Sequence, residues 1–160
     1  MNDFKEYDFV VYGATGFTGK LVVEYLVEKY SNNSEISWAL AGRNLEKLET
    51  VATSKNVPEE TGLLVVDSND ITSIEEMVSK TKCVLTTVGP YQLYGNDIVE
   101  ACAKSGIDYV DLCGEPGWMH EKINELGDVA KESGSRIVFS CGFDSIPFDL
   151  GVLFLQNEVI

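Results

Sequence analysis

The stretch VVYGATGFTGKLVVEYL, residues 10–26, joins a β-branched run to a helix-like run through the turn GATGFTG. Its three glycines, Gly13, Gly16 and Gly19, recur at intervals of three. In a phosphate-binding turn the first glycine permits a tight exit from the strand, the second lets the backbone approach a pyrophosphate, and the third lets helix and strand pack closely. The stretch therefore predicts such a turn, with a ligand-free glycine-rich turn as the alternative.

Short β-branched runs alternate with amphipathic runs along the rest of the chain. The expected strands are residues 8–12, 36–41, 63–67, 83–88, 108–112 and 136–141, and the expected helices are 17–30, 44–54, 72–80, 96–105 and 118–133. Thr72 and Glu75 have the spacing of a capping box, and Gly106 stands where a helix would end. The pattern predicts an α/β fold, a Rossmann-like doubly wound parallel sheet of about six strands with helices on both faces.

The last part of the chain has a different character, because residues 146–155 form a strongly apolar helix candidate. We expect residues 1–145 to form an NAD(P)-binding domain. Residues 146–160 are expected to begin a helix that leads to a C-terminal substrate domain outside this chain.

Composition narrows the range of partners. Twelve Lys and Arg against 26 Asp and Glu give a net charge of −14, which repels nucleic acids and anionic membrane surfaces. The N-terminus carries acids and lacks the features of a signal peptide, and no apolar run is long enough to span a bilayer, so we expect a cytoplasmic domain. The four cysteines lack the spacing of metal ligands, and we interpret them as buried apolar residues.

The residues around the glycine turn and the next strand indicate which dinucleotide is bound. Pyrophosphate is expected at the N–H groups of the helix that starts near Phe17, where the helix dipole favours an anion. An NAD enzyme usually has Asp or Glu at the end of the second strand, but here Arg43 follows Gly42. A guanidinium binds a 2′-phosphate bidentately, so NADP is favoured over NAD; a solvated arginine at a helix start is the alternative.

The expected cofactor-binding residues come from the first four strand ends. They are Gly13, Ala14, Thr15, Gly16, Phe17, Thr18 and Gly19 in the turn, Arg43, Asn44 and Lys47 after the second strand, Asp67 and Ser68 after the third, and Val88, Gly89 and Pro90 after the fourth.

Four stretches carry a family resemblance: YGATGFTGK, LAGRNLEKL, VGPYQLYGNDIVEACAKSGIDYVDLCGE and SCGFDSIPFDLG. Through them the sequence resembles the saccharopine dehydrogenase-like oxidoreductases, a family that includes the trans-acting enoyl reductases of bacterial lipid synthesis. The resemblance implies an N-terminal NAD(P)-binding Rossmann domain followed by a larger domain that helps to form the substrate site. Phe148 departs from the pattern, since relatives usually have serine after that proline.

The chemical groups expected near the carboxyl edge of the sheet are Tyr91, Tyr94, Asp111, Glu115 and Asp144. Tyr91, Asp111 and Glu115 are the catalytic candidates, although packing aromatics, loop or helix caps and a solvated turn acid are the alternatives. Tyr25 and Lys29 have the Y-x-x-x-K spacing of short-chain dehydrogenases, but they lie on the first predicted helix, away from that edge. Cys141 has no neighbouring histidine to activate it as a nucleophile.

Two classes of function follow from these residues. One is an oxidoreductase that transfers hydride to or from a carbonyl, imine or enoyl substrate, held mainly by the C-terminal domain; for it we expect a homodimer and an inactive isolated cofactor domain. The other is a non-catalytic NADP-binding sensor or scaffold.

Overall fold

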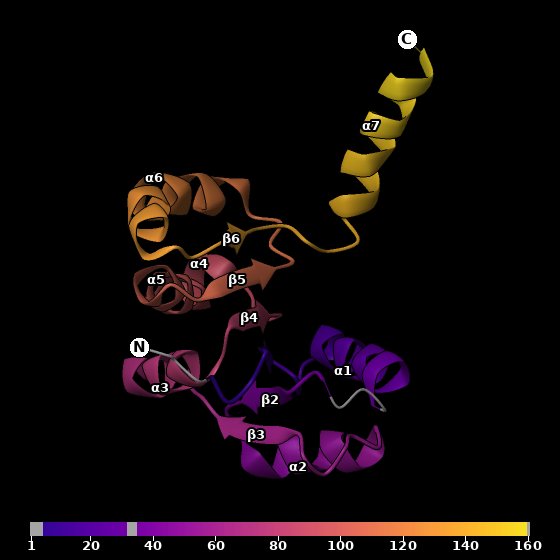
Figure 1. The fold of residues 1–160 in the computed structure, drawn as a ribbon, viewed down its shortest axis with the longest axis vertical. Helices are drawn as coiled ribbons and strands as arrows, with labels where there is room; N and C mark the ends of the chain where they lie inside the picture. The colour runs from indigo at the N-terminus through magenta and orange to yellow at the C-terminus, as the bar shows by residue number, and fades with distance from the viewer. Residues whose placement is uncertain (1–4, 32–34, 160) are drawn as a thin grey trace.

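The computed structural model describes residues 5–31 and 35–159 and contains one sheet of six parallel strands (Figure 1). The strands are β1 (Phe9–Tyr12), β2 (Trp38–Gly42), β3 (Gly62–Val65), β4 (Cys83–Thr86), β5 (Asp108–Asp111) and β6 (Ile137–Val138), in the order β3-β2-β1-β4-β5-β6. The chain runs outward from β1 to β3 and then returns to place β4 on the other side of β1. This reversal confirms the predicted doubly wound fold and marks where such sheets bind ligands.

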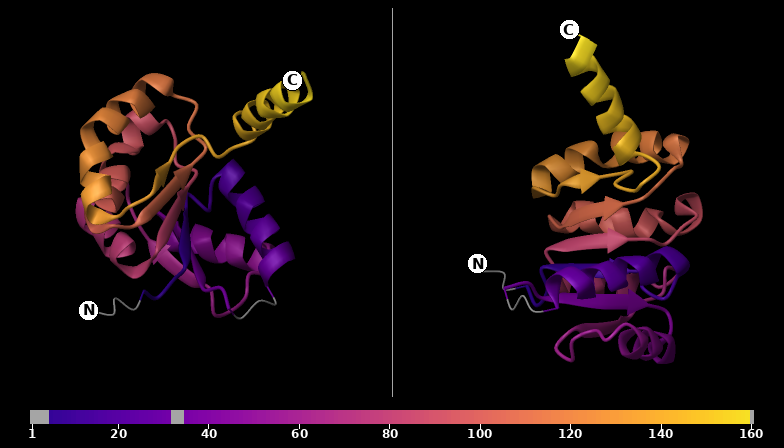
Figure 2. Two further views of the ribbon diagram at one scale, coloured as in Figure 1. Left: turned by 45° about the horizontal axis from the view of Figure 1, so that its top comes forward. Right: turned by 90° about the vertical axis from the view of Figure 1, so that its right-hand side faces the viewer.

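Helices cover both faces of the sheet (Figure 2). On one face α1 (Phe17–Tyr30) and α2 (Leu45–Ser54) pack onto Val11 and Leu40. On the other face α3 (Ile71–Lys80), α5 (Asn96–Ser105) and α6 (Pro116–Ser133) pack onto Val10, Tyr12 and their neighbours. Successive residues of β1 therefore enter opposite cores, as a strand covered on both faces requires.

The structure corrects three local predictions. A short helix, α4 (Tyr91–Tyr94), follows β4 where none was expected. The prediction of a capping box at Thr72 and Glu75 is wrong. The helix α3 starts at Ile71, and its N-cap is Asp70, whose carboxylate accepts the N–H of Thr72 at 3.1 Å. β6 is shorter than expected because Ser140 adopts a left-handed conformation, with φ of 60°, that turns the chain out of the sheet.

The apolar helix α7 (Ile146–Val159) is longer than expected and projects from the rest of the chain (Figure 1). None of its residues is buried, and Phe148, Phe154 and Leu155 are each more than 60% exposed. Within residues 5–31 and 35–159, no helix combines the length and the apolar character that a membrane span needs.

The expected burial of all four cysteines is only partly correct. Cys102 and Cys113 are buried and Cys83 is half-buried, but Cys141 is exposed, because it lies beyond the point where the chain leaves the sheet. In the described part of the chain, no three His, Cys, Asp or Glu side chains are grouped so that they can hold a metal ion.

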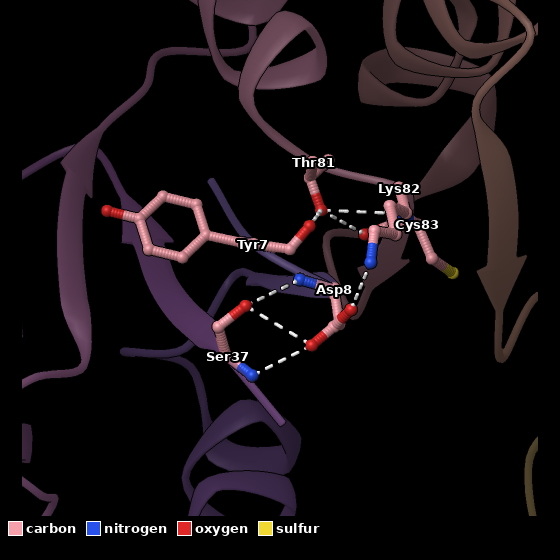
Figure 3. Close-up of polar contacts among 6 residues, drawn as sticks. All are labelled: Tyr7, Asp8, Ser37, Thr81, Lys82 and Cys83. Carbon is pink, nitrogen blue, oxygen red and sulfur yellow. Dashed lines mark hydrogen bonds and ion pairs between the residues drawn. The ribbon is translucent and has the colours of Figure 1, made fainter. Parts of the chain in front are cut away.

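Polar contacts join the starts of β1, β2 and β4 at the amino edge of the sheet (Figure 3). The Asp8 carboxylate accepts the backbone N–H of Ser37 at 2.8 Å and pairs with Lys82 Nζ at 2.6 Å. Beside it, the Thr81 hydroxyl donates to the carbonyl of Cys83 at 2.9 Å. The hydrogen bond from Lys82, and after it the one from Ser37, lowers the pKa of Asp8 below its ordinary value of 3.8.

This lowered pKa predicts an acid-dependent contribution to stability. The contribution is present above the unfolded-state pKa and is lost as the pH falls through the lower folded-state pKa. We expect Asp8→Asn to lower the free energy of unfolding at neutral pH by about 0.5–1 kcal/mol, the scale of an exposed ion pair. Urea unfolding of variant and parent, followed downward in pH, should show the two converging.

A matched control is Glu28→Gln, since Glu28 pairs with its neighbour Lys29 on the surface of α1 and both side chains are exposed. The free energy of unfolding of Glu28→Gln should stay close to that of the parent chain at every pH. A deficit in Asp8→Asn that stays constant from neutral to acidic pH would contradict the assignment.

Candidate functional site: a dinucleotide groove at the strand ends

A groove of about 240 Å³ opens at the carboxyl ends of β1, β2 and β4. Its lining residues are Tyr12, Gly13, Thr15, Gly16, Gly42, Arg43, Ser68, Thr87, Val88, Gly89 and Tyr94. Seven of the predicted cofactor-binding residues are therefore brought together: Gly13, Thr15, Gly16, Arg43, Ser68, Val88 and Gly89. The groove lies at the point where the strand order reverses, which is where such sheets bind ligands.

The glycines of the turn have separate structural roles. Gly13 has φ of +91°, and a Cβ there would lie 2.7 Å from Thr87 Oγ1. A Cβ at Gly19 would lie 2.1 Å from the carbonyl oxygen of Gly13, closer than any side chain can approach. Gly19 is therefore the residue that lets α1 pack against the turn, and Gly13 is the residue that lets the turn pass β4.

The first turn of α1 is the part of the site suited to an anion. Within the turn itself, the N–H groups of Gly13 and Ala14 donate to the carbonyl of Ala41, and that of Gly16 donates to the carbonyl of Gly13. These three N–H groups are therefore already bonded within the protein. Gly16 is the N-cap of α1 and has no side chain to bond the N–H groups that follow. The N–H groups that begin at Phe17 lack intrahelical acceptors, and the helix dipole adds positive potential there.

The cation predicted at the end of β2 lies at the groove. Arg43 is exposed, lines the groove and makes no hydrogen bond or ion pair with any residue in the described part of the chain. The Asn44 side chain caps α2 by accepting the N–H of Lys47 at 2.9 Å, which begins the helix directly after Arg43. Lys47 is exposed on the first turn of α2 but does not line the groove.

Tyr12 is the last residue of β1 and is almost completely buried, at 2% exposed. Burial raises its pKa to about 12, a hydrogen bond with Ser68 opposes the rise, and the charges of Asp67 and Arg43 act on it in opposite directions. The phenol therefore stays neutral at physiological pH and forms part of the groove wall. Asp67 itself accepts the backbone N–H and the side-chain amide of Asn69.

The far side of the groove is formed by the segment after β4. The Thr87 hydroxyl donates to the carbonyls of Tyr12 and Gly13, each at 3.3 Å, which ties this segment to the glycine turn. Val88 and Gly89 follow in the wall, and Tyr94 closes it from the end of α4. Pro90 is the N-cap residue of α4 and lies just outside the groove lining.

The remaining predicted residues lie around the groove rather than in its wall. They are Ala14, buried beneath the turn; Phe17, 84% exposed; Thr18, half-buried; Gly19, packed on the turn; and Asn44, Lys47, Asp67 and Pro90, placed as described above. Three wall residues were missed: Tyr12, Gly42 and Thr87. Each directly precedes a predicted residue, so a wider window around each strand end would have included it.

None of the three catalytic candidates lines the groove. Tyr91 is buried, donates its hydroxyl to the carbonyl of Thr86 at 3.2 Å, and has its pKa raised by burial. Asp111 is 3% exposed and accepts hydrogen bonds from the N–H groups of Cys113 and Ser140. Glu115 accepts the N–H groups of Tyr91 and Gln92. These groups hold loops in place, the role that the alternative interpretations gave to Asp111.

The other groups considered from the sequence lie outside the groove as well. Tyr25 is 54% exposed on α1, and Lys29 pairs with Glu28, as expected for a helix surface. Asp144 is exposed in the segment before α7. Cys141 is exposed, but partial desolvation by the atoms around it raises the pKa of its thiol, so the thiol is not activated as a nucleophile.

The sequence matches the family model described as the saccharopine dehydrogenase NADP binding domain over residues 9–138. The chain belongs to this family. The predicted resemblance and the prediction of NADP as the cofactor are thereby confirmed. The residues fit the cofactor, because the positions at Gly13 and Gly19 admit no side chain and the cation of Arg43, which pairs with no described residue, stands at the end of β2.

Curated relatives of this NADP-binding domain come from animals and bacteria. It is 45% identical to a lipid droplet localized protein of Caenorhabditis elegans, with 95% of this chain and 37% of that protein aligned. It is 40% identical to a saccharopine dehydrogenase-like oxidoreductase of Mus musculus, with 97% and 38% aligned. It is 43% identical to a trans-acting enoyl reductase of Mycobacterium leprae, with 99% and 37% aligned. The chain thus spans little more than a third of these relatives.

Solved structures share the fold. Apo saccharopine dehydrogenase (L-Glu forming) from Saccharomyces cerevisiae has a TM-score of 0.75 at 16% identity, covering 96% of this chain and 31% of that one. Triphenylmethane reductase of Citrobacter sp., complexed with NADP(H), has a TM-score of 0.59 at 19% identity, covering 82% and 48%. At these identities the likeness concerns the fold alone.

The close approach of Gly19 to Gly13 predicts a large effect of one methyl group. Gly19→Ala places its Cβ against backbone atoms that cannot rotate away. We expect the free energy of unfolding to fall by about 1–3 kcal/mol. Gly127→Ala is the matched control, since nothing lies within 4 Å of that Cβ position in α6. Alanine in a helix should stabilise by up to about 1 kcal/mol. Urea unfolding measures both, and equal stability of the two variants would contradict the packing role of Gly19.

Proposed function

We propose that this NADP-binding domain serves an oxidoreductase that transfers hydride to or from a carbonyl, imine or enoyl substrate, bound mainly by a C-terminal domain. The observation that carries the proposal is the position of Arg43 in the groove wall directly after β2, where its cation pairs with none of residues 5–31 and 35–159. No carboxylate stands there to receive a ribose 2′-hydroxyl, and a guanidinium is suited to a 2′-phosphate.

Three parts of the chain hold the cofactor in this proposal. The pyrophosphate lies at the first turn of α1, beside Thr15 and Gly16. Arg43 binds the 2′-phosphate, and Lys47 on the next helical turn adds a second positive charge. Val88 and Gly89 face the ribose and nicotinamide, and the bound cofactor supplies or accepts the hydride.

The domain division has two supports. Residues before Ile146 form the cofactor domain, and α7 leads into the substrate domain. A helix that is apolar on all sides is ordinarily buried within a larger protein, whereas α7 has no buried residue. The relatives are also long enough for a further domain, since the aligned region is 37–38% of their length.

The names of relatives suggest where and on what such a protein acts. The bacterial relative is named an enoyl reductase, and an Arabidopsis thaliana relative is named a probable mitochondrial saccharopine dehydrogenase-like oxidoreductase. We propose a substrate from the same chemical classes. The cytoplasmic location and the homodimer stay predictions.

The second candidate function is a non-catalytic NADP-binding sensor or scaffold. One observation favours this second function: Tyr91, Asp111 and Glu115 bond to the backbone and do not line the groove. Of the tyrosines and acids expected near the carboxyl edge of the sheet, Tyr94 lines the groove. If the protein is catalytic, we propose that its proton donors and substrate-binding groups come mainly from the second domain.

Removal of the Arg43 cation tests the cofactor assignment. We expect Arg43→Ala to weaken NADPH binding about 10- to 100-fold, the effect of losing a charge-assisted contact to phosphate, and to leave NADH binding nearly unchanged. Calorimetric titration with both cofactors measures this. Lys131→Ala on α6 is a matched control that removes one cation far from the groove wall. Equal losses for NADPH and NADH would refute the 2′-phosphate contact.

Turnover separates the two functions. We expect the isolated chain to bind NADPH without oxidising it, because a single domain does not orient a second reactant. The longer protein should oxidise NADPH with at least one carbonyl, imine or enoyl compound, followed as the loss of reduced nicotinamide absorbance. NADPH binding by the longer protein with no turnover across saccharopine-like and lipid-like compounds would support the sensor instead.

A further inference from the structure

The loop between β5 and α6, residues 112–115, reaches across to the start of α4. Its last residue, Glu115, accepts the backbone N–H of Tyr91 with Oε1 at 2.7 Å and that of Gln92 with Oε2 at 3.0 Å. Both carboxylate oxygens are thus bonded to consecutive amides from a segment 23–24 residues earlier in the chain. Such charge-assisted bonds are stronger than neutral ones and fix the geometry of both partners.

The segment that Glu115 holds is the wall of the groove on its β4 side. Gly89 lies two residues before Tyr91, and Tyr94 lies at the other end of α4, and both line the groove. Tyr91 itself is buried, and its ring packs on Trp118 at a centroid distance of 5.6 Å. The position of the groove wall therefore depends on where α4 begins, and Glu115 holds its first two N–H groups.

The loop that carries Glu115 is itself fixed by hydrogen bonds to the buried carboxylate of Asp111. Its own N–H donates to Cys113 Sγ at 3.3 Å, and the N–H of Cys113 donates to Asp111 at 3.0 Å. Asp111 also accepts the N–H of Ser140 at 2.8 Å and the hydroxyl of Tyr109 at 2.9 Å. The carboxylate of Glu115 thus extends from a hydrogen-bonded loop, and this loop fixes its position relative to α4.

We propose that Glu115 is a positioning residue that holds Gly89 and Tyr94 against the nicotinamide half of NADP(H). This assignment rests on the proposed function, and it gives Glu115 a role other than proton transfer. The adenine half is bound across the groove by Arg43, on elements that Glu115 does not touch. Loss of Glu115 should therefore weaken the binding of one half of the cofactor only.

The test compares NADPH with adenosine 2′,5′-bisphosphate, which carries the 2′-phosphate but no nicotinamide. For Glu115→Gln we expect NADPH affinity to fall about tenfold, with the bisphosphate within about twofold of the parent chain. Glu115→Asp keeps the charge but shortens the reach by one methylene, and it should show the same selective loss. Calorimetry gives both affinities, and NADPH fluorescence reports the nicotinamide environment independently.

Glu100→Gln on α5 is the matched control, because Glu100 pairs with Lys104 on the surface of that helix and does not line the groove. Parallel loss of both ligands in the Glu115 variants, or unchanged NADPH affinity in them, would overturn the assignment while leaving the proposed function in place. If the parent chain binds neither ligand, the proposed function fails and the assignment fails with it. Should Glu115→Gln not fold, the Asp variant carries the same comparison.

Discussion

The contact between Gly19 and Gly13 is the constraint on which the site depends. With 2.1 Å between the Cβ position of one and the carbonyl oxygen of the other, α1 starts as close to the end of β1 as a backbone permits. That proximity brings the first N–H groups of α1 to the carboxyl edge of the sheet. Thr87 bonds the same turn from the β4 side, so the glycine turn is held between both halves of the fold.

Charge explains why the second strand end matters so much. A chain with a net charge of −14 repels a phosphorylated dinucleotide at long range. Most of its lysines pair with acids on the surface, for instance Lys55 with Glu24 and Lys80 with Glu76. Arg43 has no such partner in the described part of the chain, and it lies in the groove wall. The local positive charge that the cofactor meets is therefore concentrated where the 2′-phosphate is expected.

The fold and the position of Arg43 at the groove were predictable because they depend on local patterns. The glycine spacing, the alternation of apolar runs and the arginine after β2 are each read from a few neighbouring residues. One missed feature, the helix α4, depends on contacts between distant segments. α4 has only four residues, and its first N–H groups are satisfied by Glu115, which follows it by more than twenty positions. β6 ends early for a different reason: Ser140, with φ of 60°, turns the chain out of the sheet, and a residue other than glycine seldom adopts that conformation.

The same distinction explains the catalytic candidates. Acids and tyrosines at the carboxyl edge of a parallel sheet resemble proton donors when only their positions in sequence are known. In the structure their polar atoms bond to backbone: Tyr91 to Thr86, Asp111 to Cys113 and Ser140, Glu115 to α4. A loop without regular structure needs acceptors for its N–H groups, and the carboxylates of Asp111 and Glu115 provide them at this edge. The acids at this edge therefore hold the loops beside the groove in place, and neither Asp111 nor Glu115 lines the groove itself.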